Sequence, residues 1–302
     1  MTITAKVIAD SINSNGVRIT TMEIEYPRFI HGEFMTHRMF SRNAASSRAI
    51  PVQKVVEQVE QSPAEPVHWG KNQSGMQANE ELTGITKVAV RDSWLCAAKE
   101  MANRAKIMSQ AGLHKQVVNR LLEPFQTIKV VVTATEWNNF WWLRDHPDAQ
   151  PEIQKLARVM KGAYEHSKPV LLQPDMWHLP YVKTSVEEHP ELLHWTQKYF
   201  DEYGNEIILE EAIKISCSSC AQVSFRKLDT SLEKAESIYK KLVESEPVHA
   251  SSFEHTAKCV NTDVFAWQEG ITHADYEGNM WSGNFKEWVQ YRQLIPNNVK
   301  KG

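Results

Sequence analysis

The sequence predicts a mixed fold of helices and strands, of the α+β or α/β class, in which helix dominates. Two runs rich in β-branched residues, 18–26 and 127–135, have the composition of buried strands. Helical patterns occupy much of the remaining length, and the longest covers residues 80–110. Hydrophobic residues make up 42% of the 302 residues, which is enough for a buried core.

The predicted elements alternate with turn-rich segments along the chain. After the first strand, Pro27 suits the first turn of a helix, and Ile30 and Phe34 keep the i, i+4 spacing of a helix face. Segment 61–79 is polar, contains two prolines and two glycines, and is expected to be a loop. Further helices are predicted at 114–125, at 136–167 with a turn in the middle, at 190–203 and at 231–245.

Proline and capping residues predict two further details. Asp148 is placed to cap the helix whose first turn contains Pro151. The proline-rich passage 168–182 is expected to cross the surface, and it separates two groups of motifs, at 17–165 and 205–302.

The charge balance and the apolar pattern argue against several classes of protein. The net charge of -3 arises from 34 basic and 37 acidic residues, so no overall field attracts DNA or an anionic membrane. No stretch approaches the roughly 18 apolar residues that span a bilayer, and the first sixteen residues lack a signal-peptide pattern. Four cysteines are too few for a disulfide scaffold. We therefore expect a cytoplasmic protein.

The segment THRMFSRNAASSR, residues 36–48, has an unusual density of hydrogen-bond donors. It contains three arginines, one histidine, one asparagine and three serines in thirteen residues. Arginine forks, hydroxyls and backbone amides at a helix end are the groups that satisfy phosphate oxygens. A phosphate-rich ligand is one interpretation, and a solvated helix end is the other.

Two cysteine- and histidine-containing segments are weaker signals. Cys217 and Cys220 have the spacing of a zinc knuckle or a redox pair, but no second pair completes four zinc ligands. Small buried thiols are therefore expected, and no metal site is predicted. The segment HASSFEH, residues 249–255, lacks the HExxH spacing, and structural histidines are as good an interpretation as functional ones.

Residues 36–48 also resemble the signature of flavin-dependent thymidylate synthases. That signature reads Arg-His-Arg, two residues, Ser, one residue, Asn-Glu, one residue, Ser, one residue, Arg-Tyr. The residues in register are His37, Arg38, Ser41, Asn43, Ser46 and Arg48, and the departures are Thr36, Ala44 and Ala49. A second segment, RDHPDAQPEI, is similar to the Arg and the His-Ala-Gln-x-Glu-Ile of the family, with Arg144, Ala149, Gln150, Glu152 and Ile153 in place and Asp148 where the family has His.

Two more segments resemble family motifs but occur in the opposite order. CAQVSF, residues 220–225, is similar to Ala-Arg-Val-Ser-Phe, and HASSFEH is similar to His-x-Thr-Pro-Phe-Glu-His. In typical members both precede the arginine signature, whereas here both follow it. The resemblance therefore implies a circularly permuted member with one domain over residues 1–302. It also implies an α+β fold that is rich in helix, with a central, mostly antiparallel sheet.

The resemblance further implies a reaction and a set of site residues. The family transfers a methylene group from methylenetetrahydrofolate and a hydride from reduced FAD to C5 of dUMP, giving dTMP, with NADPH as reductant and a homotetramer as the assembly. Arg144 matches the catalytic position, where a guanidinium at N3 and O2 stabilises the anionic pyrimidine. Substrate binding is expected at Ser46, Ser47, Arg48, Arg120, Gln290 and Arg292. Flavin or folate binding is expected at His37, Arg38, Ser41, Asn43, Asn139, Ser224, His249 and Ser251.

Alternatives remain open at this point. The departures in the arginine signature allow a related flavin and folate enzyme that forms a 5-hydroxymethyl product or uses dCMP. An alternative from another class is a protein that binds nucleic-acid phosphates through its arginines. The net charge of -3 argues against it. A catalytically inactive homologue would be recognised by its failure to bind flavin.

Overall fold

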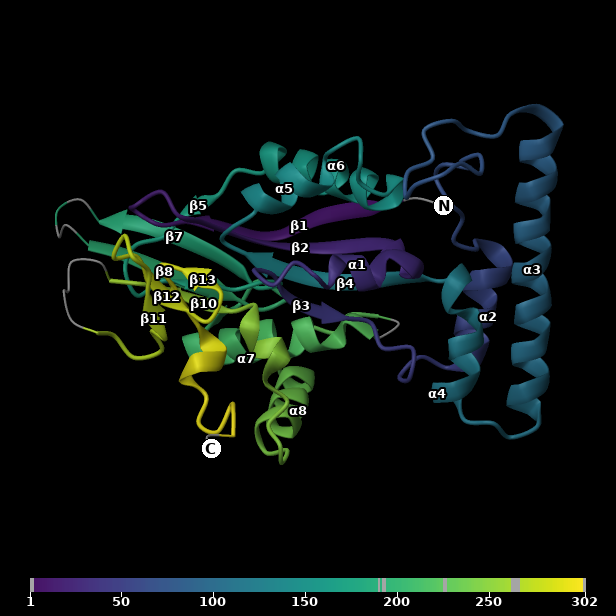
Figure 1. Cartoon of the computed structure of the whole chain (residues 1–302). Helices are drawn as coiled ribbons and strands as arrows, with labels where there is room; N and C mark the ends of the chain where they lie inside the picture. The colour runs from purple at the N-terminus through teal and green to yellow at the C-terminus, as the bar shows by residue number, and fades with distance from the viewer. Residues whose placement is uncertain (1–2, 190, 192–193, 225–226, 262–266, 301–302) are drawn as a thin grey trace.

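The computed structural model describes residues 3–189, 191, 194–224, 227–261 and 267–300. Figure 1 shows a central sheet with helices on both sides and a long helix set apart at one end. The central sheet has five strands in the order β3-β4-β2-β1-β5. Its strands are β1 (Thr4–Ile12), β2 (Arg18–Pro27), β3 (Ser41–Ala44), β4 (Thr127–Ala134) and β5 (Val170–Leu171).

The central sheet is mostly antiparallel. β2 pairs antiparallel with β1 and β4, β3 pairs antiparallel with β4, and β5 alone joins β1 in parallel. Between β1 and β2, the side-chain oxygen of Asn13 accepts the amides of Asn15 at 3.1 Å and Val17 at 2.8 Å. Gly16 has a φ of 81° in this turn, a conformation that favours glycine. The predicted α+β class and the two predicted strands are confirmed.

Helices flank the sheet and extend beyond it. The helix predicted at 231–245 is confirmed as α8, and the side chain of Ser231 accepts the amide of Lys234 at its start. The described α-helices are α1 (His31–Phe34), α2 (Val52–Gln61), α3 (Gly84–Gln110), α4 (Lys115–Val118), α5 (Asn138–Arg144), α6 (Pro151–His166), α7 (Leu209–Ala221) and α8 (Leu232–Val243). Short 3-10 helices are η1 (Arg28–Ile30), η2 (Asn119–Phe125), η4 (Gln222–Ser224), η5 (Ala250–Glu254) and η6 (Tyr291–Leu294).

One face of the central sheet carries the main apolar core. Side chains alternate along a strand, so every second residue of β2 and β4 points to this face. Helices α5 and α6 cover it (Figure 1). The buried residues of this core include Met22, Ile24, Tyr26, Val130, Val132, Phe140, Ile153, Leu156 and Met160.

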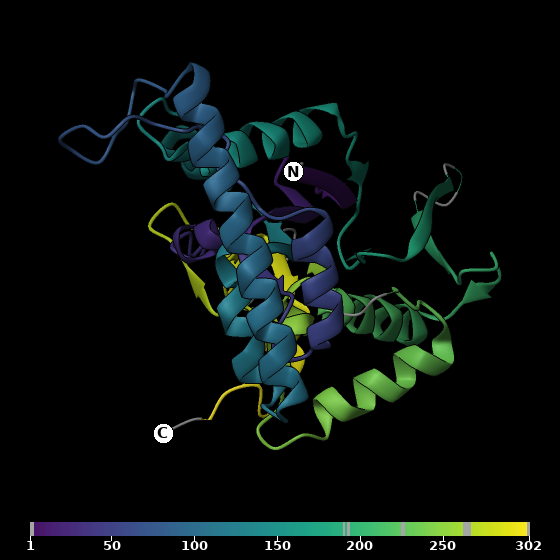
Figure 2. The same ribbon diagram turned by 90° about the vertical axis from the view of Figure 1, so that its right-hand side faces the viewer.

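A second core joins the helices at the far end of the molecule. Val56 and Val59 of α2 pack with Ala98 and Ala102 of α3, and Leu122 of η2 completes the cluster. Figure 2 shows α3 in front of α2, with its length running across this end. No helix in the described ranges combines the length and the apolar character needed to cross a membrane.

Shorter strands form three further sheets around α7 and the C-terminal part. Their orders are β14-β10-β6, β11-β12-β13 and β7-β8-β9. The strands are β6 (Trp177–His178), β7 (Lys183–His189), β8 (His194–Phe200), β9 (Glu206–Ile207), β10 (Ala257–Cys259), β11 (His273–Ala274), β12 (Met280–Ser282), β13 (Phe285–Lys286) and β14 (Trp288–Gln290).

The helix predicted at 190–203 is wrong where the structure describes it. Residues 194–200 form strand β8, which pairs antiparallel with β7, whereas 190 and 192–193 lie outside the described residues. Trp195, Gln197 and Tyr199 alternate along β8, and Gln197 exchanges hydrogen bonds of 2.8 and 2.7 Å with the backbone of Trp177. Aromatic and β-branched residues favour a strand once a partner strand is available.

Three smaller predictions also differ from the structure. The N-cap of α6 is Gln150 rather than Asp148, although Pro151 does occupy its first turn. The long helix begins at Gly84 rather than Glu80. Passage 168–182 was expected at the surface, yet Leu172, Met176, Trp177, His178 and Leu179 are buried. β5 belongs to the central sheet and β6 to the sheet that also contains β10 and β14, so the prolines lie in a passage that is partly buried.

Candidate functional site

Residues 36–48 run from the end of α1 through β3 into a loop. The guanidinium of Arg42 donates to the carbonyls of Met35 at 2.9 Å and His37 at 3.0 Å, so it holds the end of α1 in place. Arg38 and Arg48 are exposed and form no ion pair within the described part of the chain. Two of the three arginines are therefore free to meet an anionic ligand.

Arg144 reaches the same segment from the last turn of α5. Its Nε donates to His37 Nε2 at 2.8 Å, and one guanidinium nitrogen forms an ion pair with Glu33. A third, longer contact of 3.5 Å leads to Thr36 Oγ1. Because the guanidinium contacts side chains of another segment, capping of its own helix does not explain its position.

His37 is neutral in this arrangement. Burial, together with the nearby charges of Arg144 and Arg42, lowers the pKa of His37 to about 4. Since Nε2 accepts a hydrogen bond from Arg144, the ring proton is assigned to Nδ1. The ring also packs edge-on against Phe140, with centroids 4.8 Å apart. Arg144 is thus oriented by one carboxylate and one neutral imidazole.

The two groups of motifs meet at the end of β3. The backbone amide of Ser46 donates to Ser224 Oγ at 2.8 Å, and Asn43 Nδ2 donates to the carbonyl of Cys220 at 3.1 Å. Helix η5, which contains Ser251, lies beside β3. Phe225, the last residue of the CAQVSF segment, lies outside the described residues.

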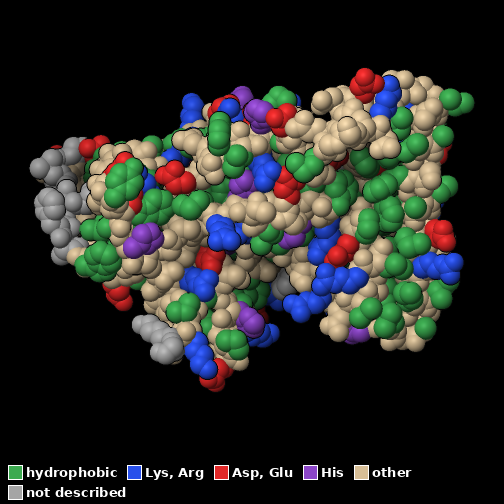
Figure 3. Space-filling view, viewed as in Figure 1, with side chains coloured by type: hydrophobic (Ala, Val, Ile, Leu, Met, Phe, Trp, Pro, Cys, Tyr) green, Lys and Arg blue, Asp and Glu red, His purple; other side chains and the backbone are tan. Residues whose placement is uncertain are grey.

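Two of the residues expected at the nucleotide phosphate, Ser47 and Arg120, contact Glu123 of η2. Arg120 Nη1 donates to this carboxylate at 2.9 Å, Ser47 Oγ at 3.4 Å, and Arg28 forms an ion pair with it at 3.2 Å. Arg120 and Ser47 are therefore brought together. Figure 3 shows Lys and Arg side chains beside the hollow between α8 and the α2 to α4 part of the molecule.

Ser41, Gln290 and Arg292 occupy structural positions in the described contacts. Gln290 is buried, and its Nε2 donates to Ser41 Oγ at 3.1 Å and to Asn284 Oδ1 at 3.0 Å. Arg292 forms an ion pair with Glu254 of the HASSFEH segment. Asn139, His249 and Ser251 are exposed, and no hydrogen bond in the described ranges joins their side chains to residues 36–48.

A buried chain of hydrogen bonds fixes the HASSFEH segment to the central sheet. His255 Nδ1 contacts Thr133 Oγ1 at 2.8 Å, Thr133 contacts Thr21 at 2.7 Å, and Thr21 contacts His178 Nε2 at 2.8 Å. Ser11 Oγ ends the chain at His178 Nδ1, 2.9 Å away. Burial lowers the pKa of His178 and of His255 to about 3, so both rings are neutral. Both histidines thus have structural partners.

Cys217 and Cys220 are buried thiols on α7. Burial raises the pKa of Cys217 to about 12 and that of Cys220 well above its usual value. Neither is a thiolate at neutral pH, which disfavours both metal binding and redox exchange. Within the described ranges, no cluster of three His, Cys, Asp or Glu side chains is arranged to hold a metal.

Sequence reasoning missed the acidic partners of the arginines. Glu33 lies four residues before His37 in a helical pattern, so it could have been placed on the same face. Glu123 gives no such signal, because its partners come from three separate segments.

Comparison with known families shows to which family the chain belongs. The profile of the Thy1 family, described as thymidylate synthase complementing protein, matches residues 18–170, just over half of the chain. The chain belongs to this family. The match covers β2, residues 36–48 and Arg144, but neither CAQVSF nor HASSFEH. A comparison with curated protein sequences finds no match.

Several solved structures are similar to parts of this chain. A UMP/dUMP methylase PolB from Streptomyces cacaoi, bound with 5-Br dUMP, is 15% identical over 54% of this chain and 90% of that one, with a TM-score of 0.45. A second PolB structure, bound with 5-Br UMP, has a TM-score of 0.43. The flavin-dependent thymidylate synthase ThyX from Helicobacter pylori, complexed with FAD and dUMP, is 19% identical over 49% of this chain and 70% of that one, with a TM-score of 0.34.

Proposed function

We propose that the protein transfers a one-carbon unit from methylenetetrahydrofolate to C5 of a pyrimidine deoxynucleotide, and that it converts dUMP to dTMP. The observation that carries this proposal is the position of Arg144, which the pair of Glu33 and His37 holds against residues 36–48. A guanidinium fixed in this way is ready to contact N3 and O2 of a pyrimidine. It would stabilise the negative charge that makes C5 nucleophilic.

The donor set fits a flavin with a diphosphate. Arg38 is exposed without an ion pair in the described residues, and Ser224 lies at the end of β3 beside Ser46. With Asn43, Asn139 and Ser251, these side chains supply the charge and hydroxyl groups that such a cofactor requires. When bound, FAD would supply the hydride for the new methyl group, and NADPH would restore it.

The remaining residues have roles in nucleotide binding and orientation. The nucleotide phosphate would be held by Arg48 and Arg120, with Ser46 and Ser47. To do so, Arg120 must give up its hydrogen bond to Glu123 and contact the phosphate instead. Ser41, Gln290 and Arg292 would keep β3 and η5 in register rather than contact the nucleotide. His37 stays neutral, so it orients Arg144 without adding charge.

The inverted order of motifs supports a circular permutation. The hydrogen bonds from Ser46 to Ser224 and from Asn43 to Cys220 join the two groups in space. A permutation keeps such contacts while it moves the chain ends. Joining residues 300 and 3 by a flexible linker and opening the chain in the exposed turn at 202–204 would test this, because the proposal expects a folded protein that still takes up FAD.

The proposal includes a homotetramer. α3 exposes Ile85, Val88, Val90, Ile107 and Met108 to solvent, an apolar surface that a second copy would cover. Light scattering on the purified protein measures its mass directly. A monomer at all concentrations would contradict this part of the proposal.

The test of the function compares two matched variants. Arg144→Lys keeps the charge but loses the planar fork, and losing a preorganised donor at a developing anion costs about 2.7–4 kcal/mol, roughly a hundredfold to a thousandfold in rate. Arg158→Lys is the control, because Arg158 pairs with Asp145, the residue that follows α5. Flavin absorbance should persist in both variants, while nucleotide-dependent oxidation of reduced flavin should fail only in Arg144→Lys. Equal turnover in the two variants would remove Arg144 from the reaction.

A related product is the second candidate. Thr36, Ala44 and Ala49 depart from the family signature, and they lie in the segment that contacts Arg144 and Ser224. Mass spectrometry of the product separates methyl from 5-hydroxymethyl, and parallel assays with dUMP and dCMP identify the acceptor.

A further inference from the structure

A pocket of about 520 Å³ lies on the side of the central sheet opposite α5 and α6. One wall is formed by β1, β2 and β4, and the other by the end of α7, η4 and the start of β7. Its size is in the range of small-molecule sites, about 300–1,000 Å³. Polar side chains in its lining include Lys6, Glu23, Lys129, Tyr181 and Ser219. None of the residues proposed for flavin, folate or nucleotide binding lines it.

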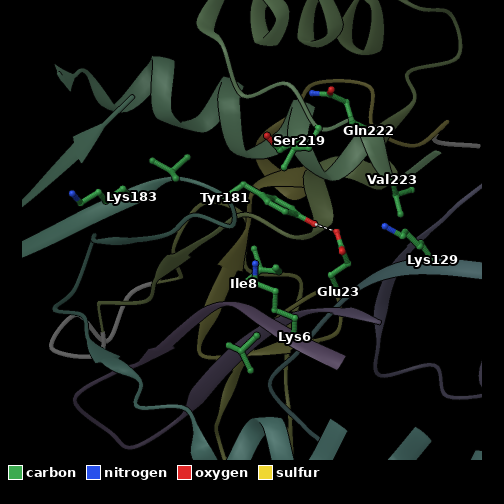
Figure 4. A pocket seen from close by; sticks show the side chains of 12 residues that line it. Lys6, Ile8, Glu23, Lys129, Tyr181, Lys183, Ser219, Gln222 and Val223 are labelled. Atoms are coloured by element: carbon green, nitrogen blue, oxygen red, sulfur yellow. Dashed lines mark hydrogen bonds between the residues drawn. The ribbon is translucent and has the colours of Figure 1, made fainter. Parts of the chain in front are cut away.

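The sheet wall carries two lysines on either side of one carboxylate. Lys6 on β1 lies directly opposite Glu23 on β2, and Lys129 on the neighbouring β4 shares this face. In the described ranges neither lysine forms an ion pair. Figure 4 shows the Lys129 amino group directed toward the hydrogen bond between Tyr181 and Glu23. The wall thus has an excess of positive charge.

Tyr181 is held in an uncommon backbone conformation at the pocket. Its φ is 66°, in the left-handed region that residues other than glycine rarely adopt. Its hydroxyl donates to Glu23 Oε2 at 3.3 Å, and burial keeps the pKa of this hydroxyl above its usual value. Strained backbone of this kind is concentrated at binding and catalytic sites. Here the hydroxyl of Tyr181 fixes the carboxylate of Glu23, and the two lysines remain as donors for a ligand.

The helix wall adds an unpartnered hydroxyl. Ser219 of α7 is 1% exposed, lines the pocket, and its Oγ has no hydrogen-bond partner in the described residues. Buried hydroxyls are normally paired, and an unpaired one is costly. Its neighbour Ser218 donates to a carbonyl of its own helix at 3.1 Å, whereas Ser219 does not. The Ser219 hydroxyl is therefore the donor on this wall that has no partner in the described residues.

We propose that this pocket binds a small organic anion. A phosphate or carboxylate group contacts Lys6, Lys129 and Ser219, and an apolar body packs on Ile8, Val182 and Val223. Lysine supplies point charges to such a group, and serine supplies one directional hydrogen bond. The site is separate from the proposed reaction, and it stands or falls independently of that function.

Two probes distinguish the head groups. Phenyl phosphate and benzoate share a ring and differ in the anion, and titration calorimetry of the purified protein without FAD measures both. We expect one of them to bind, and the tighter probe identifies the head group. If neither binds at millimolar concentration, the proposal is overturned.

Charge-matched variants locate the binding. Lys6→Gln with Lys129→Gln removes both pocket charges and should weaken the better probe at least tenfold. Lys155→Gln with Lys241→Gln removes two exposed lysines from α6 and α8 and should leave the affinity unchanged. Equal losses in both double variants would show nonspecific attraction and overturn the site. FAD uptake should be normal in both, so a failure here is distinct from a failure of the proposed function.

Ser219→Ala separates a ligand donor from a core hydroxyl. The variant removes an unpaired polar atom, so the melting temperature without ligand should stay the same or rise. Affinity for the better probe should fall severalfold, and the stabilisation by that probe should fall with it. Unchanged affinity would contradict the assignment of Ser219.

Discussion

The two faces of the central sheet have opposite chemistry. The face under α6 is apolar, and its residues Met22, Ile24 and Val132 belong to one buried cluster with Leu156. The other face carries the buried chain from Ser11 to His255, and then the charged wall of the pocket. Because successive residues of a strand point to opposite faces, β2 and β4 serve both purposes at once. The apolar face holds the main core, and the polar face contacts the second group of motifs and lines the pocket.

The largest effect is expected on the apolar face. Leu156 is fully buried on α6, and Leu156→Ala removes buried methyl groups and leaves a cavity. We expect a loss of about 2–5 kcal/mol in the free energy of unfolding. Urea unfolding measures it, with the exposed neighbour Lys155→Ala as the control, which should stay within about 0.5 kcal/mol. A loss below that of the control would show that α6 does not carry the core.

A reciprocal pair of substitutions on β4 compares the two faces directly. Thr133→Val removes the hydroxyl that contacts Thr21 and His255, at almost unchanged volume. Val132→Thr places a hydroxyl on the apolar face. Each leaves buried polar atoms without partners and should cost about 1–3 kcal/mol of unfolding free energy. If Thr133→Val stabilises the protein, the buried chain does not contribute to stability.

The polar face should also make stability depend on pH. His178 and His255 are neutral in the folded protein, with pKa values of about 3, whereas unfolded histidine titrates near 6.5. As pH falls from about 6.5 toward 3, the unfolded state binds more protons, so the folded state loses stability by up to about 1.4 kcal/mol per pH unit for each histidine.

Urea unfolding between pH 7 and pH 5 measures this slope. His178→Asn and His255→Asn should be less stable at pH 7, yet each should show a flatter dependence on pH than the parent protein. The same slope in the parent and in both variants would assign the pH dependence to other groups.

The smallest effect is expected where the polar face opens into the pocket. Tyr181→Phe removes one hydrogen bond of 3.3 Å to Glu23, which is partly exposed. We expect a loss of about 0.5–1.5 kcal/mol, measured by thermal unfolding. If Tyr181→Phe lost more unfolding free energy than Thr133→Val, the open part of this face would contribute more stability than the buried part.

The sequence predicted those elements whose pattern is local. β2, β4 and α8 have clear periodicity or capping, and all three were found close to their predicted ends. β8 was missed because its strand character depends on pairing with β7, which lies earlier in the chain. The surface position predicted for passage 168–182 was wrong because prolines indicate turns in the sequence, whether or not neighbouring strands bury those turns.

The candidate site shows the same division between local and distant signals. Residues 36–48 and Arg144 belong to contiguous motifs, so they could be named from the sequence. The partners of Glu123 and the pocket residues come from several separate elements, and no spacing within any element reveals them. No sequence pattern separates Ser218, whose hydroxyl donates to a carbonyl of its own helix, from Ser219, whose hydroxyl has no partner in the described residues.

The buried chain from Ser11 to His255 implies an order of events on the ribosome. β4 ends at Ala134, α6 ends at His166, and His255 follows much later. At synthesis rates of about 5–20 residues per second, the apolar face would gain its cover within roughly 2–6 s, but the polar face would wait roughly 6–24 s for its last partner. Threonine and charged side chains tolerate water during that delay, whereas valine and methionine in their place would invite aggregation. At these rates, the face that is covered last is the one that carries the threonine and charged side chains.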